Sequence, residues 1–127
     1  MEFITEADNT DNILTWRESD IEAANDYLLS LARKYGLTDE LILIPPRSGI
    51  KRLGVAVACR ECAASMVGSD ATVSVNGRSE DIYLQKYNLY RSMVKDLASS
   101  LGFEDFAVED TSAEGKGGVG IIRISRG

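Results

Sequence analysis

The sequence predicts a mainly α-helical protein, a small bundle of three main helices with an N-terminal arm and an extended C-terminal β-strand tail. Apolar residues recur at three- and four-residue steps in three segments, and each segment stops at a glycine, Gly36, Gly68 or Gly102. A glycine-rich stretch then leads into a strand-like run. We therefore divide the 127 residues into an arm (1–18), a helical bundle domain (19–102), and an acidic linker with the strand tail (103–127).

The arm mixes a few apolar residues with Asp, Asn and Thr, which is typical of short turns that pin apolar anchors: Phe3, Ile4, Ile13, Leu14 and Trp16. The first helix is predicted to begin at a capping box, Ser19-Asp-Ile-Glu22, and to end at Gly36. Its apolar stripe comprises Ile21, Ala24, Leu28, Leu31, Ala32 and Tyr35.

Residues 37–46 are predicted to be a connector, because Pro45-Pro46 forbids a helix there. Ser48 can cap a second helix from Gly49 to Val67, closed by Gly68. This helix is apolar on several faces, so it is either central or placed between subunits. The residues that we assign to a subunit interface on it are Val55, Ala56, Cys59 and Ala63.

Residues 69–80 form a polar excursion with Asn76-Gly77 at its tip, and 71–75 is a weak strand candidate. The third helix is predicted to begin at Ser79 or Asp81 and to run to Leu101. Its stripe comprises Tyr83, Tyr87, Tyr90, Val94, Leu97, Ala98 and Leu101. A tyrosine stripe at this spacing favours core or interface, and we add the three tyrosines to the subunit-interface residues.

The linker's apolar side chains, Phe103, Phe106 and Val108, are expected to fold back on the bundle. After them comes a hinge of four glycines, Gly115, Gly117, Gly118 and Gly120. The run that follows needs a neighbouring strand, because unpaired backbone groups beside apolar side chains cost free energy. We predict that it adds to a sheet of another chain through Val119, Ile121, Ile122, Arg123, Ile124 and Arg126. An intrachain strand beside 71–75, or a frayed terminus, is the alternative.

Composition excludes several classes of function. The net charge of −6 disfavours simple binding to the phosphate backbone of nucleic acids. Histidine is absent, which removes the usual residue for proton transfer near neutral pH and the commonest metal ligand. The sequence has neither a run of about 18 apolar residues nor a secretory signal, so we expect a soluble, cytoplasmic protein.

Two motifs look like chemistry and are better explained otherwise. Gly115-Lys-Gly-Gly-Val-Gly120 matches the opening of a partition-type ATPase phosphate-binding loop, but Ile121 and Ile122 replace the Lys and Thr that such a loop needs. Cys59-Arg-Glu-Cys62 could be half a zinc site or a redox pair. No further Cys or His completes a zinc site, and a redox pair normally lies at a helix start rather than in the middle of a helix. We interpret it as two small buried cysteines. The sequence thus predicts no cofactor, no metal and no enzyme activity.

The order of elements resembles the head-tail connector, or adaptor, proteins of tailed bacteriophages. The resemblance lies in Ser19-Asp-Ile-Glu-Ala-Ala-Asn-Asp-Tyr-Leu28, in Ala32-Arg-Lys-Tyr-Gly-Leu37, and in the helix from Tyr87 to Leu101 after Asp81-Ile-Tyr-Leu-Gln-Lys-Tyr-Asn-Leu-Tyr-Arg91. It covers about two-thirds of the chain, in architecture more than in identities.

The resemblance implies a structural protein of the virion neck that assembles in the host cytoplasm. It would form a homo-oligomeric ring, commonly a dodecamer, between the portal protein and a downstream neck or tail protein. DNA would pass through the channel without specific binding, and a C-terminal extension would grip the portal. The competing interpretation is a small dimeric helical regulatory protein that pairs through its C-terminal strand. A DNA reader of that kind needs a basic recognition helix, and the helix with Lys86, Arg91 and Lys95 is too balanced in charge.

Overall fold

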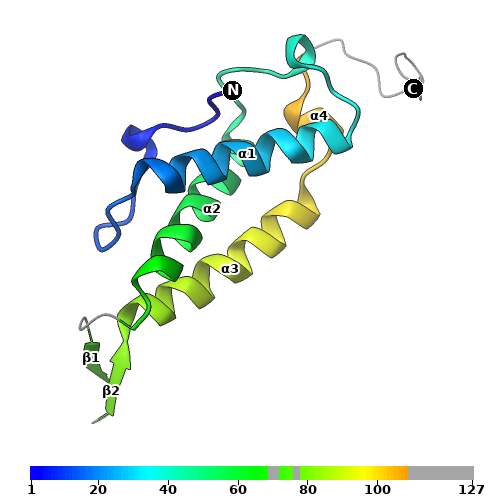
Figure 1. The fold of residues 1–127 in the computed structure, drawn as a ribbon. Helices are drawn as coiled ribbons and strands as arrows, with labels where there is room; N and C mark the ends of the chain where they lie inside the picture. Colours follow the sequence, from blue (N-terminus) through cyan, green and yellow to red (C-terminus); the bar gives the residue numbers. More distant parts are fainter. Residues whose placement is uncertain (69–71, 76–77, 109–127) are drawn as a thin grey trace.

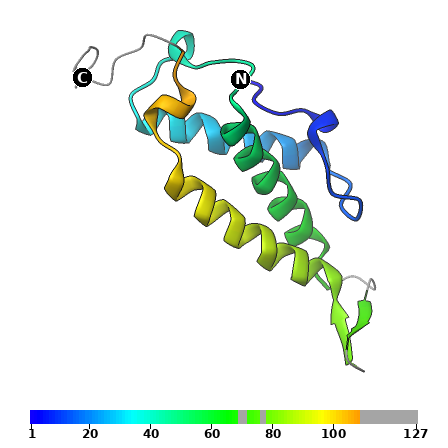
Figure 2. The same cartoon turned by 180° about the vertical axis from the view of Figure 1, so that it is seen from behind.

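The computed structural model describes residues 1–68, 72–75 and 78–108 of the chain (Figure 1). These residues are mainly helical, as the sequence predicts. The main helices are α1 (Glu18–Lys34), α2 (Ser48–Met66) and α3 (Ile82–Ser100), and a short helix, α4 (Phe103–Phe106), follows them. α1 and α3 both pack against α2, which places α2 at the centre of the body (Figures 1 and 2).

The N-cap of α1 lies two residues before the first residue of the predicted capping box. Arg17 is the N-cap residue, and its backbone N–H donates to the carboxylate of Asp20 (2.9 Å). The prediction of Ser19 as the cap is wrong, because the Asp20 carboxylate already satisfies this helix start and also binds the Arg17 guanidinium (2.6 Å). The predicted end is confirmed. Gly36 has φ +83°, and the amides of Gly36 and Leu37 donate to the carbonyls of Arg33 and Ala32.

α2 runs through the core. Nine of its residues are buried: Ile50, Leu53, Gly54, Ala56, Val57, Ala58, Cys59, Cys62 and Ala63. Of the two predicted placements, central or between subunits, the structure shows the central one within this chain. Ser48 is its first helical residue rather than its cap, which is Arg47, and the helix ends before Gly68, whose φ is +91°.

The predicted excursion between the second and third helices contains a β-hairpin. Strand β1 (Thr72–Val75) pairs antiparallel with β2 (Arg78–Asp81), with Thr72 opposite Asp81. Asp81 then caps α3, because its carboxylate accepts hydrogen bonds from the backbone amides of Tyr83 (2.9 Å) and Leu84 (3.3 Å). Of the two predicted start sites for this helix, the structure selects Asp81.

The start of the arm is held to α1 by one amide side chain. Asn25 of α1 accepts from the backbone N–H groups of Phe3 (2.9 Å) and Ile4 (3.0 Å), and its own amide donates to the Ile4 carbonyl (3.2 Å). Phe3, Ile4, Leu14 and Trp16 are buried as predicted, whereas Ile13 is 45% exposed. The arm therefore belongs to the folded body.

Residues 103–108, the first part of the predicted linker, pack on the body. α4 buries Phe106, and the segment after it runs antiparallel to the connector with a bridge between Ile42 and Ala107. The amides of Leu43 and Val108 donate to the carbonyls of Phe106 and Leu41, both at 2.9 Å. The predicted fold-back of Phe103, Phe106 and Val108 is confirmed.

Gly54 marks the closest approach of three segments. A Cβ atom at this position would lie 2.8 Å from Ile4 Cγ2 and 2.9 Å from Leu28 Cδ1, so the arm, α1 and α2 meet where a side chain does not fit. We expect Gly54→Val to destabilise the protein by about 3 kcal/mol, measured by chemical denaturation, because Ile4 and Leu28 are buried and must shift. Gly102→Ala is the control, since a Cβ there meets nothing within 4 Å. Equal losses from both variants would contradict this packing.

Candidate functional site

The tail residues predicted to bind a partner cannot be placed. Residues 109–127 lie outside the described part of the chain. This range holds the predicted hinge and all six predicted strand residues, which are Gly115, Gly117, Gly118, Gly120, Val119, Ile121, Ile122, Arg123, Ile124 and Arg126. Their assignment stays a prediction.

The predicted subunit-interface residues divide into two groups. Ala56, Cys59 and Ala63 are at most 1% exposed within the single chain, because α1 and α3 already cover α2. A neighbouring subunit does not reach these three side chains in this conformation, so they are core rather than interface. Val55, Tyr83, Tyr87 and Tyr90 are half-buried and pack against the core, as expected of a stripe with its rim at the surface.

The two cysteines are free and buried, as predicted. Burial raises the pKa of Cys62 to about 11, helped by the negative charge of Asp20, and its thiol donates to the Thr15 carbonyl (3.3 Å). Burial also raises the pKa of Cys59. Both thiols are thus protonated at neutral pH, whereas nucleophiles and metal ligands need thiolates. Within the described residues, no cluster of Cys, Asp and Glu is suited to hold a metal ion.

A buried polar cluster lies where the arm meets α3. The Asp11 carboxylate accepts hydrogen bonds from Lys86 Nζ (2.9 Å) and Tyr90 Oη (2.5 Å), and from the backbone amides of Ile13 and Leu14. Burial acts to raise the pKa of Asp11, but hydrogen bonds from Tyr90, Lys86 and the two amides together lower it to about 2. Burial and the Asp11 carboxylate raise the pKa of Tyr90. This cluster ties the arm to α3, so we assign it a structural role.

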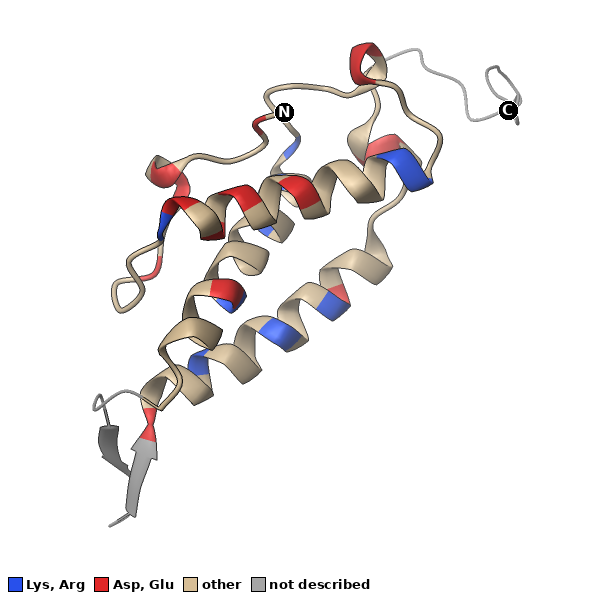
Figure 3. Cartoon of the chain, viewed as in Figure 1, with Lys and Arg blue, Asp and Glu red and all other residues tan. Residues whose placement is uncertain are grey.

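An acidic hollow of about 400 Å³ lies between the arm and α1. Its lining includes four glutamates beside Trp16 and Ile21, namely Glu2, Glu6, Glu18 and Glu22. Further along α1, Asp26 continues the row at the four-residue spacing that places side chains on one helix face. Figure 3 shows the resulting concentration of acidic residues on α1. We call Glu18, Glu22 and Asp26 the acidic flank.

The exposed side of α3 has the opposite sign. Arg91 and Lys95 are exposed and four residues apart, and Leu84 and Asn88 lie on the same side of the helix. Lys86 adds a third basic residue on α3, but the Asp11 carboxylate neutralises it. Figure 3 shows these basic positions along α3, away from the acidic positions of α1. We call Leu84, Asn88, Arg91 and Lys95 the basic flank.

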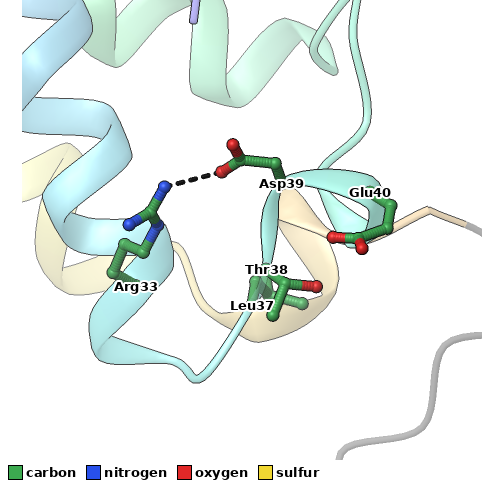
Figure 4. A pocket seen from close by; sticks show the side chains of 5 residues that line it. All are labelled: Arg33, Leu37, Thr38, Asp39 and Glu40. Atoms are coloured by element: carbon green, nitrogen blue, oxygen red, sulfur yellow. Dashed lines mark hydrogen bonds and ion pairs between the residues drawn. The ribbon is translucent and has the colours of Figure 1, made fainter.

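A second hollow, of about 330 Å³, lies where α1 turns into the connector (Figure 4). Asp39 is turned toward Arg33 and accepts from its guanidinium at 2.6 Å, while Glu40 is turned away from the pair (Figure 4). Both partners are more than half exposed, so the ion pair contributes about 1 kcal/mol or less. Its main effect is to neutralise the cation at the C-terminal end of α1.

Sequence reasoning missed the residues that place these features. Asn25 binds the backbone of Phe3 and Ile4, and Asp11 binds Lys86 and Tyr90 of α3. Arg47 donates to the carbonyls of Glu104 (3.0 Å) and Ala107 (2.6 Å). Each acts on a partner that is remote in sequence, so no local pattern predicts the contact. The acidic flank was missed as well, although its signal is local, since Glu18, Glu22 and Asp26 follow the helical period in the sequence itself.

The fold and its surface define a small helical protein with two flanks of opposite charge. Among the described residues, no helix is both long and apolar enough to cross a membrane. Comparison with protein-family models, with curated proteins and with solved structures finds no match for this chain.

Proposed function

We propose that the protein is a structural component of the neck of a tailed bacteriophage. It assembles into a ring, docks on the portal protein, and binds a downstream neck or tail protein. The head-tail adaptors that it resembles commonly form dodecameric rings. The observation that carries the proposal is the architecture. Three main helices follow one another, an order that resembles the head-tail adaptors, and α1 and α3 pack on α2 while each keeps an exposed flank.

A protein that forms a ring needs two different surfaces, one for each neighbour. A helix whose apolar side is buried in the core can use its exposed side for such a contact without loss of stability to the fold. The net charge of −6 fits a channel wall past which DNA slides, since like charges keep the phosphate backbone from adhering.

The C-terminal residues supply the contact with the portal in this proposal. The glycines from Gly115 to Gly120 would give the tail its reach, and the β-branched residues Val119, Ile121, Ile122 and Ile124 suit addition to the edge of a sheet. Backbone hydrogen bonds would give the affinity and the isoleucine side chains the specificity. Arg123 and Arg126 flank the strand and favour an acidic edge on the portal.

Deletion of residues 116–127 should abolish docking on the portal and leave the body folded, because every contact described above lies within residues 1–108. Co-sedimentation with purified portal rings measures docking, and thermal unfolding reports the fold. A full-length variant with Ile121, Ile122 and Ile124 changed to Asn keeps the length of the tail and should also fail to dock. Docking by the truncated protein would refute the assignment. If the protein forms a stable dimer and does not bind the portal, the alternative of a small dimeric regulatory protein is favoured instead.

A further inference from the structure

The acidic flank of α1 carries charges that form no ion pair within the described part of the chain. Glu18, Glu22 and Asp26 are exposed, and no ion pair reaches them from any of the described residues. Successive members stand about 6 Å apart along the helix, because each residue rises about 1.5 Å. Glu2 and Glu6 of the arm add to the negative potential in the hollow beside them.

The basic flank of α3 is the matching surface. Arg91 and Lys95 are exposed at the same separation of about 6 Å, and they too form no ion pair with the described residues. Leu84 lies on the same side of α3 and is 45% exposed, so the flank also offers an apolar contact. Asp96 follows Lys95 in the sequence, but consecutive residues of a helix lie about 100° apart around its axis, so Asp96 is not part of the basic flank.

The two flanks lie on different helices, which pack on different parts of α2. The acidic flank repels a second acidic flank, and the basic flank repels a second basic flank, so like surfaces do not pair between copies. Opposite flanks attract each other, and a contact between them would be heterologous because it joins two different surfaces. A head-to-tail chain of copies then keeps one unpaired flank at each end until the ring closes.

We propose that the acidic flank of one copy binds the basic flank of the next copy, head to tail. Arg91 and Lys95 of one copy then face Glu18, Glu22 and Asp26 of its neighbour, and the hollow of about 400 Å³ beside Trp16 receives one of the two basic side chains. This inference rests on the proposed ring-forming function and names the surfaces that build the ring. Its occupant is a second copy of this chain.

Exposed ion pairs contribute only about 0.2–1 kcal/mol each, so their role is to select orientation and partner rather than to supply most of the affinity. Reversing the charges of one flank has a larger effect than removing them, because every attraction becomes a repulsion. Self-association should also weaken as salt rises, since exposed charges are screened over about 3 Å at 1 M ionic strength.

The test uses two charge-reversal variants of the full chain. In the first, Glu18, Glu22 and Asp26 are changed to Lys, and both flanks become basic. In the second, Arg91 and Lys95 are changed to Glu, and both flanks become acidic. Each variant alone should self-associate at least about tenfold more weakly than the original protein. An equimolar mixture should restore assembly, because each basic flank then meets an acidic one in an alternating ring.

Native mass spectrometry and sedimentation velocity measure these assemblies, and thermal unfolding confirms that both variants are folded. The matched control reverses exposed charges away from both flanks, Arg52→Glu with Glu104→Lys, and should assemble like the original protein. The inference is overturned if the original protein is monomeric or if either variant alone assembles like the original. It is also overturned if the equimolar mixture of the two variants does not assemble or forms only a dimer. Portal docking is measured separately. If the protein docks on the portal but charge reversal does not change its self-association, only this inference is refuted. If the mixed variants assemble again but the protein does not dock on the portal, the proposed function is refuted.

Discussion

Phe106→Ala should destabilise the protein by about 3–5 kcal/mol, the usual cost of deleting a buried aromatic ring. Phe106 is 1% exposed, although it lies in a helix of only four residues near the end of the described chain. Its ring contacts Phe3 edge-on, with centroids 6.3 Å apart, and Tyr35 in a tilted arrangement at 6.1 Å. The substitution therefore leaves a cavity bordered by the arm, the end of α1 and the connector.

Chemical denaturation measures the loss, and limited proteolysis tests its location. The arm should become easier to cleave, because Phe3 loses its aromatic neighbour. Phe103→Ala is the control: Phe103 begins the same short helix but is only partly buried, so its loss should be smaller. A change of less than 1 kcal/mol for Phe106→Ala would mean that residues 103–108 do not pack on the body.

The helices and the ends of α1 and α2 at Gly36 and Gly68 are predictable from the sequence, because the signals are local. A stripe at three- and four-residue steps needs only its own helix, and a glycine after it supplies the positive φ that other residues avoid. Gly36 and Gly68 adopt that conformation, at +83° and +91°. Asp81 was one of two expected starts for α3 because Asp is a strong N-cap residue.

The start of α1 is harder to predict, because two adjacent polar residues compete. Ser19 fits the capping-box pattern, but Asp20 accepts hydrogen bonds from both the backbone and the guanidinium of Arg17. A charged acceptor paired with an arginine makes the stronger interaction, and it moves the start of the helix to Glu18. The capping-box pattern, Ser19 followed three residues later by Glu22, carries no information on the pairing of Asp20 with Arg17.

The candidate site is predictable only in part, for a similar reason. The four-residue spacing of Glu18, Glu22 and Asp26 is visible in the sequence, but the exposure of the flank and its uncompensated charge require the fold. The small apolar residues of α2 illustrate the opposite case. Ala56 and Ala63 suit close packing against any helix, so the sequence does not distinguish a neighbour in the same chain from one in another subunit, and the structure assigns them to the core.

Asp11→Ala should destabilise the protein by about 3 kcal/mol at neutral pH. The Asp11 side chain is 2% exposed and accepts from Lys86, Tyr90 and two backbone amides. Removing the carboxylate leaves the Lys86 ammonium and the Tyr90 hydroxyl without this partner in a largely buried site, which costs more than the pair contributes on its own. Because the loop of residues 11–14 loses its acceptor, the contact between the arm and α3 should open first.

The pH dependence distinguishes this electrostatic role from simple packing. The pKa of Asp11 falls from 3.8 to about 2 on folding, so the unfolded chain binds the proton more readily than the folded one. The ionised carboxylate therefore contributes about 2 kcal/mol at all pH values well above 3.8, and this contribution is lost as the pH falls through the interval from 3.8 to about 2. Asp11→Asn removes the charge and should abolish that part of the acid dependence.

Denaturation curves of the original protein and of Asp11→Asn, recorded between pH 7 and pH 2, measure the difference in stability. We expect the gap to be constant from pH 7 to about pH 5 and to close below it, because both proteins are then neutral at residue 11. Glu104→Gln is the control, since it removes an exposed carboxylate of α4 and should leave the acid dependence of the original protein unchanged. A gap that stays constant down to pH 2 would show that Asp11 acts through its shape and hydrogen bonds rather than through its charge.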